Sequence, residues 1–302
     1  MSALVFDRAF DPAHGEAVEL VPGLRRLTAA NAGPFTFRGT NSYVVGTGSL
    51  VVIDPGPDDA AHVAALVAAC GGRPVSHILV THTHRDHSPA ARALQALTGG
   101  EIVAEGPHRP ARPLGAGEAY AMEASADRDF RPDRILAGGE VLVTPAGRFT
   151  AVATPGHTAN HLAFALEETE FLFSGDHVMA WSTTVVAPPD GAMADYMASL
   201  ERIAACPQQV YLPGHGGPVR DGPAFVAGLH AHRLGREAAI LGAVAGGADT
   251  APAIVRAVYR DLDPRLEGAA AMSVFSHLED LVARGRLATD GAPRPDGRYR
   301  SL

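Results

Sequence analysis

The chain has 302 residues, of which 46% are hydrophobic and 19% charged, and its formal net charge is −8. This length accommodates one large domain and a small one. The negative charge argues against a general nucleic-acid coat, which would be basic. All 25 basic residues are arginine, so catalysis by a lysine Schiff base or a lysine general base is excluded.

The cysteines and the N-terminus bear on the compartment. Cys70 and Cys206 lie far apart and lack a CxxC spacing, so we expect two free thiols in a reducing environment. The N-terminus does not combine a basic start with an apolar run, as a secretory signal would. No stretch approaches the ~20 apolar residues of a membrane span. We therefore expect a soluble cytoplasmic protein without a membrane partner.

The first hundred residues alternate apolar runs with turns and two Ala-rich segments. Residues 41–45 and 50–54 flank a Gly-Thr-Gly turn, which predicts a hairpin. Asp58 is expected to cap a first helix, and Ser88 with Pro89 to begin a second. The other predicted elements are a helix at 60–70, a strand at 75–80, a helix at 90–97 and a strand at 101–104.

Residues 105–134 carry Pro, Arg, Gly and charge without periodicity, which predicts a long surface loop. Regular strands resume after it. Strands in series with helices at intervals predict two packed sheets with helices outside, an αββα sandwich of the α/β (α+β) class. The predicted strands are 140–143, 149–154, 162–166, 171–173 and 210–212, and the predicted helix is 194–205.

The pattern changes after Gly222-Pro223. Helices are predicted at 224–243, 253–259 and 269–284, followed by two short strands around a Gly/Pro-rich turn. Two helices and a small hairpin are the outline of a winged helix. We therefore predict a sandwich domain at 1–222 and a winged-helix-like domain at 223–302.

The charge of this second domain does not favour reading of a DNA sequence. DNA readers of this shape carry an excess of Arg and Lys on the recognition helix. Here acidic side chains fall on or near that helix, so we expect no sequence-specific DNA binding. Packing, cleft formation and homodimerisation are the roles considered. The acidic residues are Asp261, Asp263, Glu267, Glu279 and Asp280, and Arg298 and Arg300 on the predicted wing remain able to touch phosphate.

Four potential metal ligands fall within six residues, directly after the strand predicted at 75–80. Three later strands run into glycine-containing turns that each deliver one more ligand-type side chain. Imidazole and carboxylate together suit a borderline divalent cation such as zinc. The seven residues are His82, His84, Asp86, His87, His157, Asp176 and His215.

Seven ligands suffice for two ions, predicted as zinc with manganese or iron as alternatives. A carboxylate has two oxygens to offer, so one aspartate can bridge two ions. Two ions about 3.5–4 Å apart can share a hydroxide that is nucleophilic near neutral pH, without a serine or cysteine nucleophile. The predicted sets are His82, His84 and His157 for one ion, Asp86, His87 and His215 for the other, and Asp176 as the bridge.

The run His82-x-His84-x-Asp86-His87, with the three later ligands, resembles the metallo-β-lactamase superfamily over roughly residues 20–220. This resemblance implies the αββα fold and dizinc hydrolase chemistry. The commonest true metallo-β-lactamases carry cysteine where Asp176 stands, which disfavours antibiotic hydrolysis. Flavodiiron proteins replace an early histidine by glutamate, which disfavours redox chemistry. The set present here is shared by glyoxalase II and RNase Z.

A narrower resemblance covers the whole chain. Stretches 39–43, 81–88, 129–133, 181–186 and 195–200 are similar to the β-lactamase-like endoribonuclease family known from mitochondria. Members of that family end in a winged-helix-like domain and cleave single-stranded RNA, so the resemblance implies a phosphodiester substrate. Glyoxalase II-like hydrolysis of an ester or thioester is the alternative. A non-catalytic winged-helix regulator with a degenerate hydrolase domain is the third hypothesis.

Side chains outside the ligand set also have expected roles. Asp86 is expected to orient the second ion and to help move a proton, which makes it the predicted catalytic residue. Trp181 is expected to stack on a base or to pack. The candidates for substrate contacts are Ser182, Thr183 and Thr184. His161 is expected to support a ligand or to be structural, His14, His62, His108, His230 and His232 to face solvent, and Arg85 to form a salt bridge.

Overall fold

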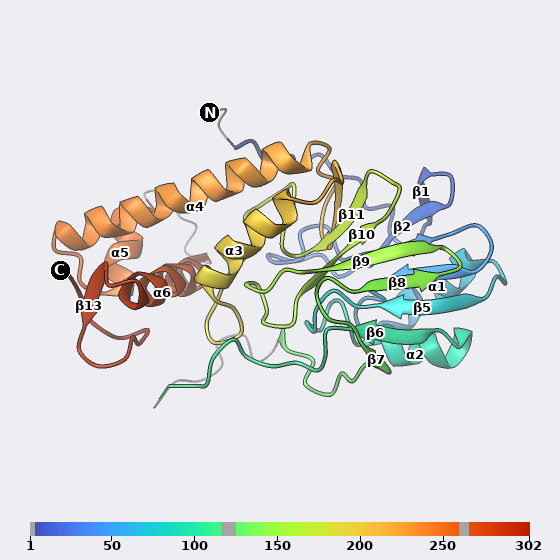
Figure 1. Cartoon of the computed structure of the whole chain (residues 1–302), viewed down its shortest axis with the longest axis horizontal. Coiled ribbons are helices and arrows are strands. Elements are labelled where there is room, and N and C mark those ends of the chain that lie inside the picture. Colours follow the sequence, from blue (N-terminus) through green and yellow to red (C-terminus); the bar gives the residue numbers. More distant parts are fainter. Residues whose placement is uncertain (1–3, 116–124, 260–265) are drawn as a thin grey trace.

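The computed structural model describes residues 4–115, 125–259 and 266–302. Two stacked sheets fill one half of the molecule, and a group of helices fills the other half (Figure 1). The predicted αββα sandwich and the C-terminal winged helix are both present. Asp261, Asp263 and part of the predicted loop at 105–134 lie outside the described residues.

The first sheet has the order β1-β2-β3-β4-β5-β6-β7 among the described residues. Strands β1 to β4 pair antiparallel, and β4 to β7 pair parallel. Parallel neighbours need a crossover, which α1 provides between β4 and β5 and α2 between β5 and β6. The bounds are β1 Val18–Val21, β2 Leu24–Thr28, β3 Asn41–Val45, β4 Leu50–Ile53, α1 Ala60–Cys70, β5 Val75–Leu79, α2 Ala90–Thr98, β6 Glu101–Ala104 and β7 Arg134–Ile135.

The second sheet has the order β12-β11-β10-β9-β8 in the described part of the chain. Its strands pair antiparallel, except for the parallel pair β11 and β12. Helix α3 forms the crossover between these two parallel strands. The bounds are β8 Val141–Thr144, β9 Gly147–Ala153, β10 Leu162–Leu166, β11 Phe171–Gly175, α3 Met193–Ala204 and β12 Val210–Pro213.

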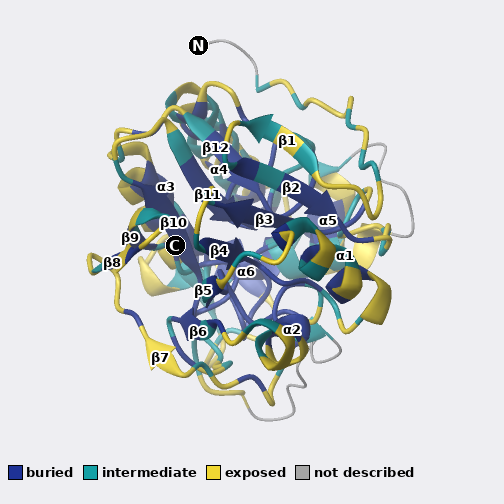
Figure 2. Ribbon diagram, turned by 90° about the vertical axis from the view of Figure 1, so that its right-hand side faces the viewer, coloured by how far each residue is buried: buried dark blue, intermediate teal, exposed yellow. Residues whose placement is uncertain are grey.

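Strand β4 shows how the layers are built. Val51 and Ile53 belong to the core between the two sheets, whereas Leu50 and Val52 belong to the core beneath α1 and α2. Side chains alternate across a strand, so a wholly apolar strand faces both layers. Tyr196 of α3 lies in a further core against the second sheet. The central strands are buried, and β7 at the sheet edge is exposed (Figure 2).

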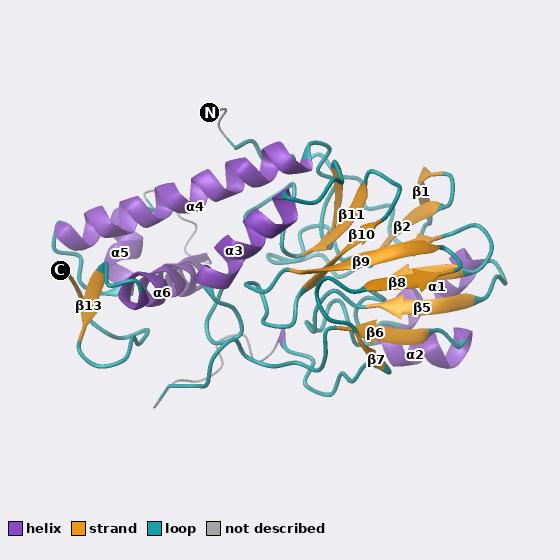
Figure 3. Ribbon diagram, viewed as in Figure 1, coloured by secondary structure: helices purple, strands orange, loops and turns teal. Residues whose placement is uncertain are grey.

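The C-terminal helices have a core of their own (Figure 3). Helix α4 links this core to the sandwich, because Val226 and Leu229 pack with the second sheet while Ile240 and Val244 pack with α5 and α6. Tyr299 closes the core from the small hairpin. The bounds are α4 Gly222–Ala245, α5 Ala251–Val258, α6 Glu267–Ala283, β13 Leu287–Thr289 and β14 Tyr299–Ser301.

Both predicted N-terminal caps were wrong. The side chain of Asp59, not Asp58, caps α1 by accepting from the Ala61 N–H. Helix α2 begins after Pro89 without a side-chain cap. The Ser88 N–H donates to the His84 carbonyl, and the Ser88 hydroxyl donates to Asp127 at 2.6 Å. Ser88 therefore belongs to the histidine-rich turn rather than to the helix.

The arginines of the predicted wing are paired with acids. Arg298 pairs with Asp249, and Arg300 pairs with Asp290. Glu279 on α6 pairs with Arg112 of the sandwich domain. No helix in the described part of the chain is long and apolar enough to cross a membrane.

Candidate metal centre

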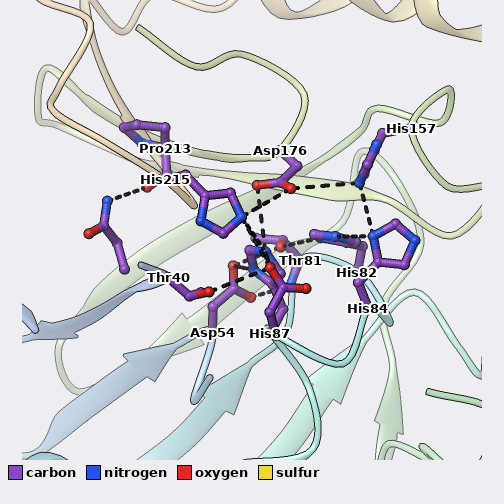
Figure 4. A network of polar contacts seen from close by, with 12 residues as sticks. Thr40, Asp54, Thr81, His82, His84, His87, His157, Asp176, Pro213 and His215 are labelled. Carbon is purple, nitrogen blue, oxygen red and sulfur yellow. Dashed lines mark hydrogen bonds and ion pairs between the residues drawn. The ribbon is translucent and has the colours of Figure 1, made fainter. Parts of the chain in front are cut away.

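All seven predicted ligands converge at the edge of the sandwich that faces the C-terminal helices. Figure 4 labels six of them, His82, His84, His87, His157, Asp176 and His215. The edge forms where strands of both sheets end, so each ligand follows a buried strand or ends one. A rigid strand end fixes the start of the loop that carries the side chain. The loop after β5 carries His82, His84, Asp86 and His87, the turn after β9 carries His157, and the turns after β11 and β12 carry Asp176 and His215.

His82, His84 and His157 form the first group. Their nearest ring nitrogens lie within 4.8 Å of one another. Nδ1 of His84 lies 3.0 Å from Nε2 of His157 and 3.2 Å from Nε2 of His82. Three imidazole nitrogens thus face one point, an arrangement that suits a single cation.

Asp86, His87 and His215 form the second group, again with ligand atoms within 4.8 Å. Oδ2 of Asp86 lies 3.1 Å from Nε2 of His215 and 3.4 Å from Nε2 of His87. Asp176 lies between the two groups, because its Oδ2 is 3.3 Å from Nε2 of His215 and 3.6 Å from Nε2 of His157. The structure thus brings together all the residues of the predicted pairing.

The outer nitrogen of two ligand-type rings contacts a backbone carbonyl. Nδ1 of His157 donates to the Val185 carbonyl at 2.6 Å, and Nδ1 of His215 donates to the Gly39 carbonyl at 3.2 Å. Such contacts fix the orientation of the ring, so that Nε2 points toward the centre and is the atom that would bind a cation. These two rings are therefore oriented before any cation arrives.

Asp54 is a site residue that the sequence analysis treated only as a strand terminus. It follows β4, and its Oδ2 lies 2.9 Å from Nδ1 of His87. It also accepts from the Thr81 N–H at 2.7 Å and from the Thr81 hydroxyl at 2.8 Å. The sequence feature that could have revealed Asp54 is its position as a carboxylate at the end of β4, the strand that pairs in parallel with β5.

His161 supports Asp176, which is the first of the two roles expected for it. Its Nε2 accepts from the Asp176 N–H at 3.2 Å. Its Nδ1 therefore carries the proton and donates to the Thr154 hydroxyl at 2.8 Å. This buried ring fixes the backbone that delivers Asp176.

The side chains of the centre shift one another's pKa values. Burial alone would raise the pKa of Asp86, but His87 and His215 outweigh it and hold that pKa well below its ordinary value. Burial alone would lower the pKa of His215, but Asp176 and Asp86 raise it to about 9. Burial, with His157 acting in the same direction, lowers the pKa of His84 to about 3.

These properties fit cations rather than a plain polar core. Oδ1 of Asp176 is buried and accepts no hydrogen bond from the described residues, and Nε2 of His87 lies 3.5 Å from it. Asp54, Asp86 and Asp176 gather at one place, where protons on His87 and His215 supply the balancing charge. Metal ligands must give up such protons, so a divalent cation would take their place.

A cavity of about 550 Å³ opens on this centre. Its lining includes Asp86, His157 and Asp176 on one side and residues of α4 and α6 on the other. Ser182, Thr183 and Thr184 also line it. The Thr184 hydroxyl donates to the Asp176 carbonyl at 2.7 Å, so that side chain holds the bend behind the ligand.

Trp181 and Arg85 also belong to the cavity wall. Trp181 stacks on Phe37 with ring centroids 4.8 Å apart and an interplanar angle of 9°. Arg85 has no ion pair among the described residues, so its expected salt bridge is not found there. Its Nε donates to the Ala126 carbonyl at 3.2 Å instead.

The expectation that His62 and His108 face solvent was wrong. His62 is buried with Nε2 2.8 Å from the Ser42 hydroxyl, and burial lowers its pKa to about 4. The His108 side chain is 5% exposed and lies 3.5 Å from Asp190. Helical and loop periodicity did not reveal that these rings point inward. His14 is exposed as expected, and His230 and His232 are half-buried.

Comparison with protein families agrees with the geometry. Residues 35–215 match the metallo-beta-lactamase superfamily, and residues 250–296 match the beta-lactamase associated winged helix domain. The chain therefore belongs to the metallo-beta-lactamase superfamily. With its intact His/Asp cluster it is a metal-dependent hydrolase, which leaves the hypothesis of a non-catalytic regulator without support.

Individual proteins of known sequence or structure are also similar to this chain. The chain is 30% identical to "Beta-lactamase-like protein 2 homolog" of Drosophila melanogaster over 89% of this chain and 93% of that protein. It is 29% identical to "Atrochrysone carboxyl ACP thioesterase dmxR1" of Cryptosporiopsis, over 75% of this chain and 64% of that one. A solved beta-lactamase domain protein from Burkholderia ambifaria is 25% identical, with a TM-score of 0.79 over 98% and 96% of the chains.

Proposed function

We propose that this protein is a dinuclear metal-dependent thioesterase that hydrolyses a small acyl thioester to a carboxylic acid and a thiol. One observation carries the proposal: a cavity of about 550 Å³ opens directly on the His/Asp centre. Sites for small molecules have volumes of about 300–1,000 Å³. A relative named as an acyl-carrier-protein thioesterase supports the substrate class.

The protein's own residues would hold the ions. His82, His84 and His157 would form one set, Asp86, His87 and His215 would form the other, and Asp176, between the two sets, would serve both ions. The histidine-rich set favours zinc, with manganese and iron as alternatives. Two such ions supply Lewis acidity toward a carbonyl oxygen and activate water near neutral pH.

Asp86 is the proposed catalytic residue of the chain. Among the three carboxylates of the centre its side chain is the most exposed, at 24%, and it lines the cavity. Its low pKa keeps it ionised, so it can orient the second ion and accept a proton from water. Asp54 and His161 act through His87 and Asp176 and keep those groups in place.

Cleavage of single-stranded RNA is the second candidate. Arg8, Arg85, Arg233 and Arg236 line the same cavity, and arginine suits phosphate recognition. The flat face formed by Trp181 on Phe37 offers a stacking partner for a base. These features favour a phosphodiester next to the same metal centre.

One experiment separates the two candidates. The purified protein, with its metals quantified, is incubated with S-acyl thioesters, followed by thiol release, and with end-labelled single-stranded RNA. Thioester turnover that disappears in the Asp86→Ala variant supports the proposal. Cleavage of RNA without thioester turnover would overturn it in favour of the nuclease. A content below about one metal ion per chain would contradict the dinuclear centre itself.

A further inference from the structure

Arg233 of α4 is a buried cation without an acidic partner. It is 4% exposed, and no described carboxylate forms an ion pair with it. Its Nη2 donates to the Thr184 carbonyl, and its Nη1 lies 3.5 Å from the Ser273 hydroxyl. Its Nε has no partner among the described residues. A guanidinium has five N–H donors, so much of its capacity is unused.

Arg236 lies one helical turn further along α4, where positions three apart share a face. Its guanidinium carbon lies 4.0 Å above the Tyr259 ring. No hydrogen bond or ion pair with a described residue engages its nitrogens. Arg233, Arg236 and Ser273 all line the cavity that opens on the metal centre. Two arginines of α4 therefore line one volume.

The positive charges of Arg233 and Arg236 are not balanced by carboxylates in the described part of the cavity wall near them. Within the described lining the carboxylates are Asp86 and Asp176, and both belong to the metal centre. Burial lowers the pKa of His232, and Arg233 and Arg236 lower it further. A buried charge without a counter-ion is costly, so such a group is normally paired. The missing counter-ion is then expected from the ligand.

We propose that Arg233 and Arg236, with the Ser273 hydroxyl, form an anion-binding subsite that binds a phosphate or carboxylate group of the substrate. This inference rests on the proposed function, because it names the substrate as an anionic thioester. Arginine's planar fork matches both groups in two-point contacts. The subsite lies on α4 and α6, on the other side of the cavity from the metal centre, so it would hold the end of the substrate remote from the thioester bond.

Two sources of the anion are chemically possible. The group is either a phosphate on the thiol carrier or a terminal carboxylate on the acyl chain. The cavity has a mixed lining, with Met179, Val185 and Leu266 among its apolar residues. An apolar segment with one charged end suits such a lining.

A binding measurement tests the subsite without relying on turnover. Trp181 is the single tryptophan of the chain and lines the same cavity, so its fluorescence reports on ligands there. Inorganic phosphate is titrated into wild type, Arg236→Met and the control Arg256→Met, which removes an exposed arginine of α5 outside the cavity. We expect about tenfold weaker binding in Arg236→Met, since a charged hydrogen bond contributes at least that factor, and no change in the control. Equal affinities in wild type and Arg236→Met would overturn the proposal.

Arg233 needs a gentler change because it is buried and contacts Thr184. Arg233→Lys keeps the positive charge and removes the planar guanidinium group with its paired N–H donors. We expect weaker phosphate binding with a melting temperature close to that of wild type. Phosphate binding as tight as in wild type would contradict two-point recognition by this residue.

Matched thioesters identify the anion. They are S-butyryl-N-acetylcysteamine, which is neutral, S-succinyl-N-acetylcysteamine, which adds an acyl carboxylate, and S-butyryl-phosphopantetheine, which adds a carrier phosphate. We expect Arg236→Met to lower kcat/KM about tenfold for one anionic substrate, mainly through KM, and to leave the neutral one unchanged. Equal loss on all three would overturn the subsite. If wild type hydrolyses none of them, the proposed function fails, and the phosphate titration still decides the subsite.

Discussion

Oδ2 of Asp54 lies 2.9 Å from Nδ1 of His87, and the two side chains are 3% and 0% exposed. This pair joins the end of β4 to the histidine loop that follows β5. The Asp54 carboxylate also accepts two hydrogen bonds from Thr81. The candidate metal centre is therefore held in place from the neighbouring strand, without a bound cation.

The variant Asp54→Asn tests this support. The Asn amide has the size of the carboxylate and can keep its contacts with Thr81, but it lacks the negative charge that holds His87. We therefore expect the metal affinity to fall about 10–100-fold. Competition with a chelator measures the affinity. Asp58→Asn is the control, because Asp58 is exposed and lies outside the ligand groups. An unchanged affinity in the Asp54→Asn protein would show that His87 is oriented without the carboxylate.

Metal binding should depend on pH. Because the pKa of His215 is raised to about 9 by Asp176 and Asp86, the metal-free protein carries a proton there at lower pH. A cation must displace that proton, so affinity should rise as pH increases toward 9, by about tenfold per unit for each proton released. Titrations between about pH 6.5 and 9.5, corrected for the chelator, measure the slope. A flat profile would contradict the protonated state.

The catalytic assignment of Asp86 predicts a large loss of turnover. Asp86→Ala removes a ligand and the ionised carboxylate at the cavity, so we expect kcat to fall about 10²–10⁴-fold. The bound metal should fall toward one ion per chain. Asp129→Ala, which removes an exposed carboxylate elsewhere, serves as the control. Near-normal turnover in Asp86→Ala with both ions retained would refute the assignment.

Gly156, which precedes His157, should tolerate no side chain. Its φ is +141°, and an added Cβ would meet the backbone of Tyr196 on α3. We expect Gly156→Ala to lower the free energy of unfolding by about 2–4 kcal/mol, from backbone strain and overpacking together. Gly72→Ala is the control, with φ +73° and no atom within 4 Å, and should show only the strain. Denaturant unfolding measures both, and equal effects would exclude the clash.

Local patterns predicted most of the framework. The apolar run at 75–80 became β5, and the three C-terminal helices and the hairpin formed as expected. The caps were less predictable, because Asp58 and Asp59 are chemically equal candidates and only backbone geometry selects one. Ser88 failed as a cap because its hydroxyl finds Asp127, a partner 39 residues away.

The sequence by itself determined which side chains are available as ligands, because strand–turn periodicity places each at a strand end. The tertiary structure decided everything that depends on distance between strand ends. It brought Asp54 against His87, set Asp176 between the two ligand groups, and placed Arg233 of α4 in the wall of the same cavity. Such contacts join residues far apart in sequence, and they follow from strand order and domain packing, which no local pattern encodes.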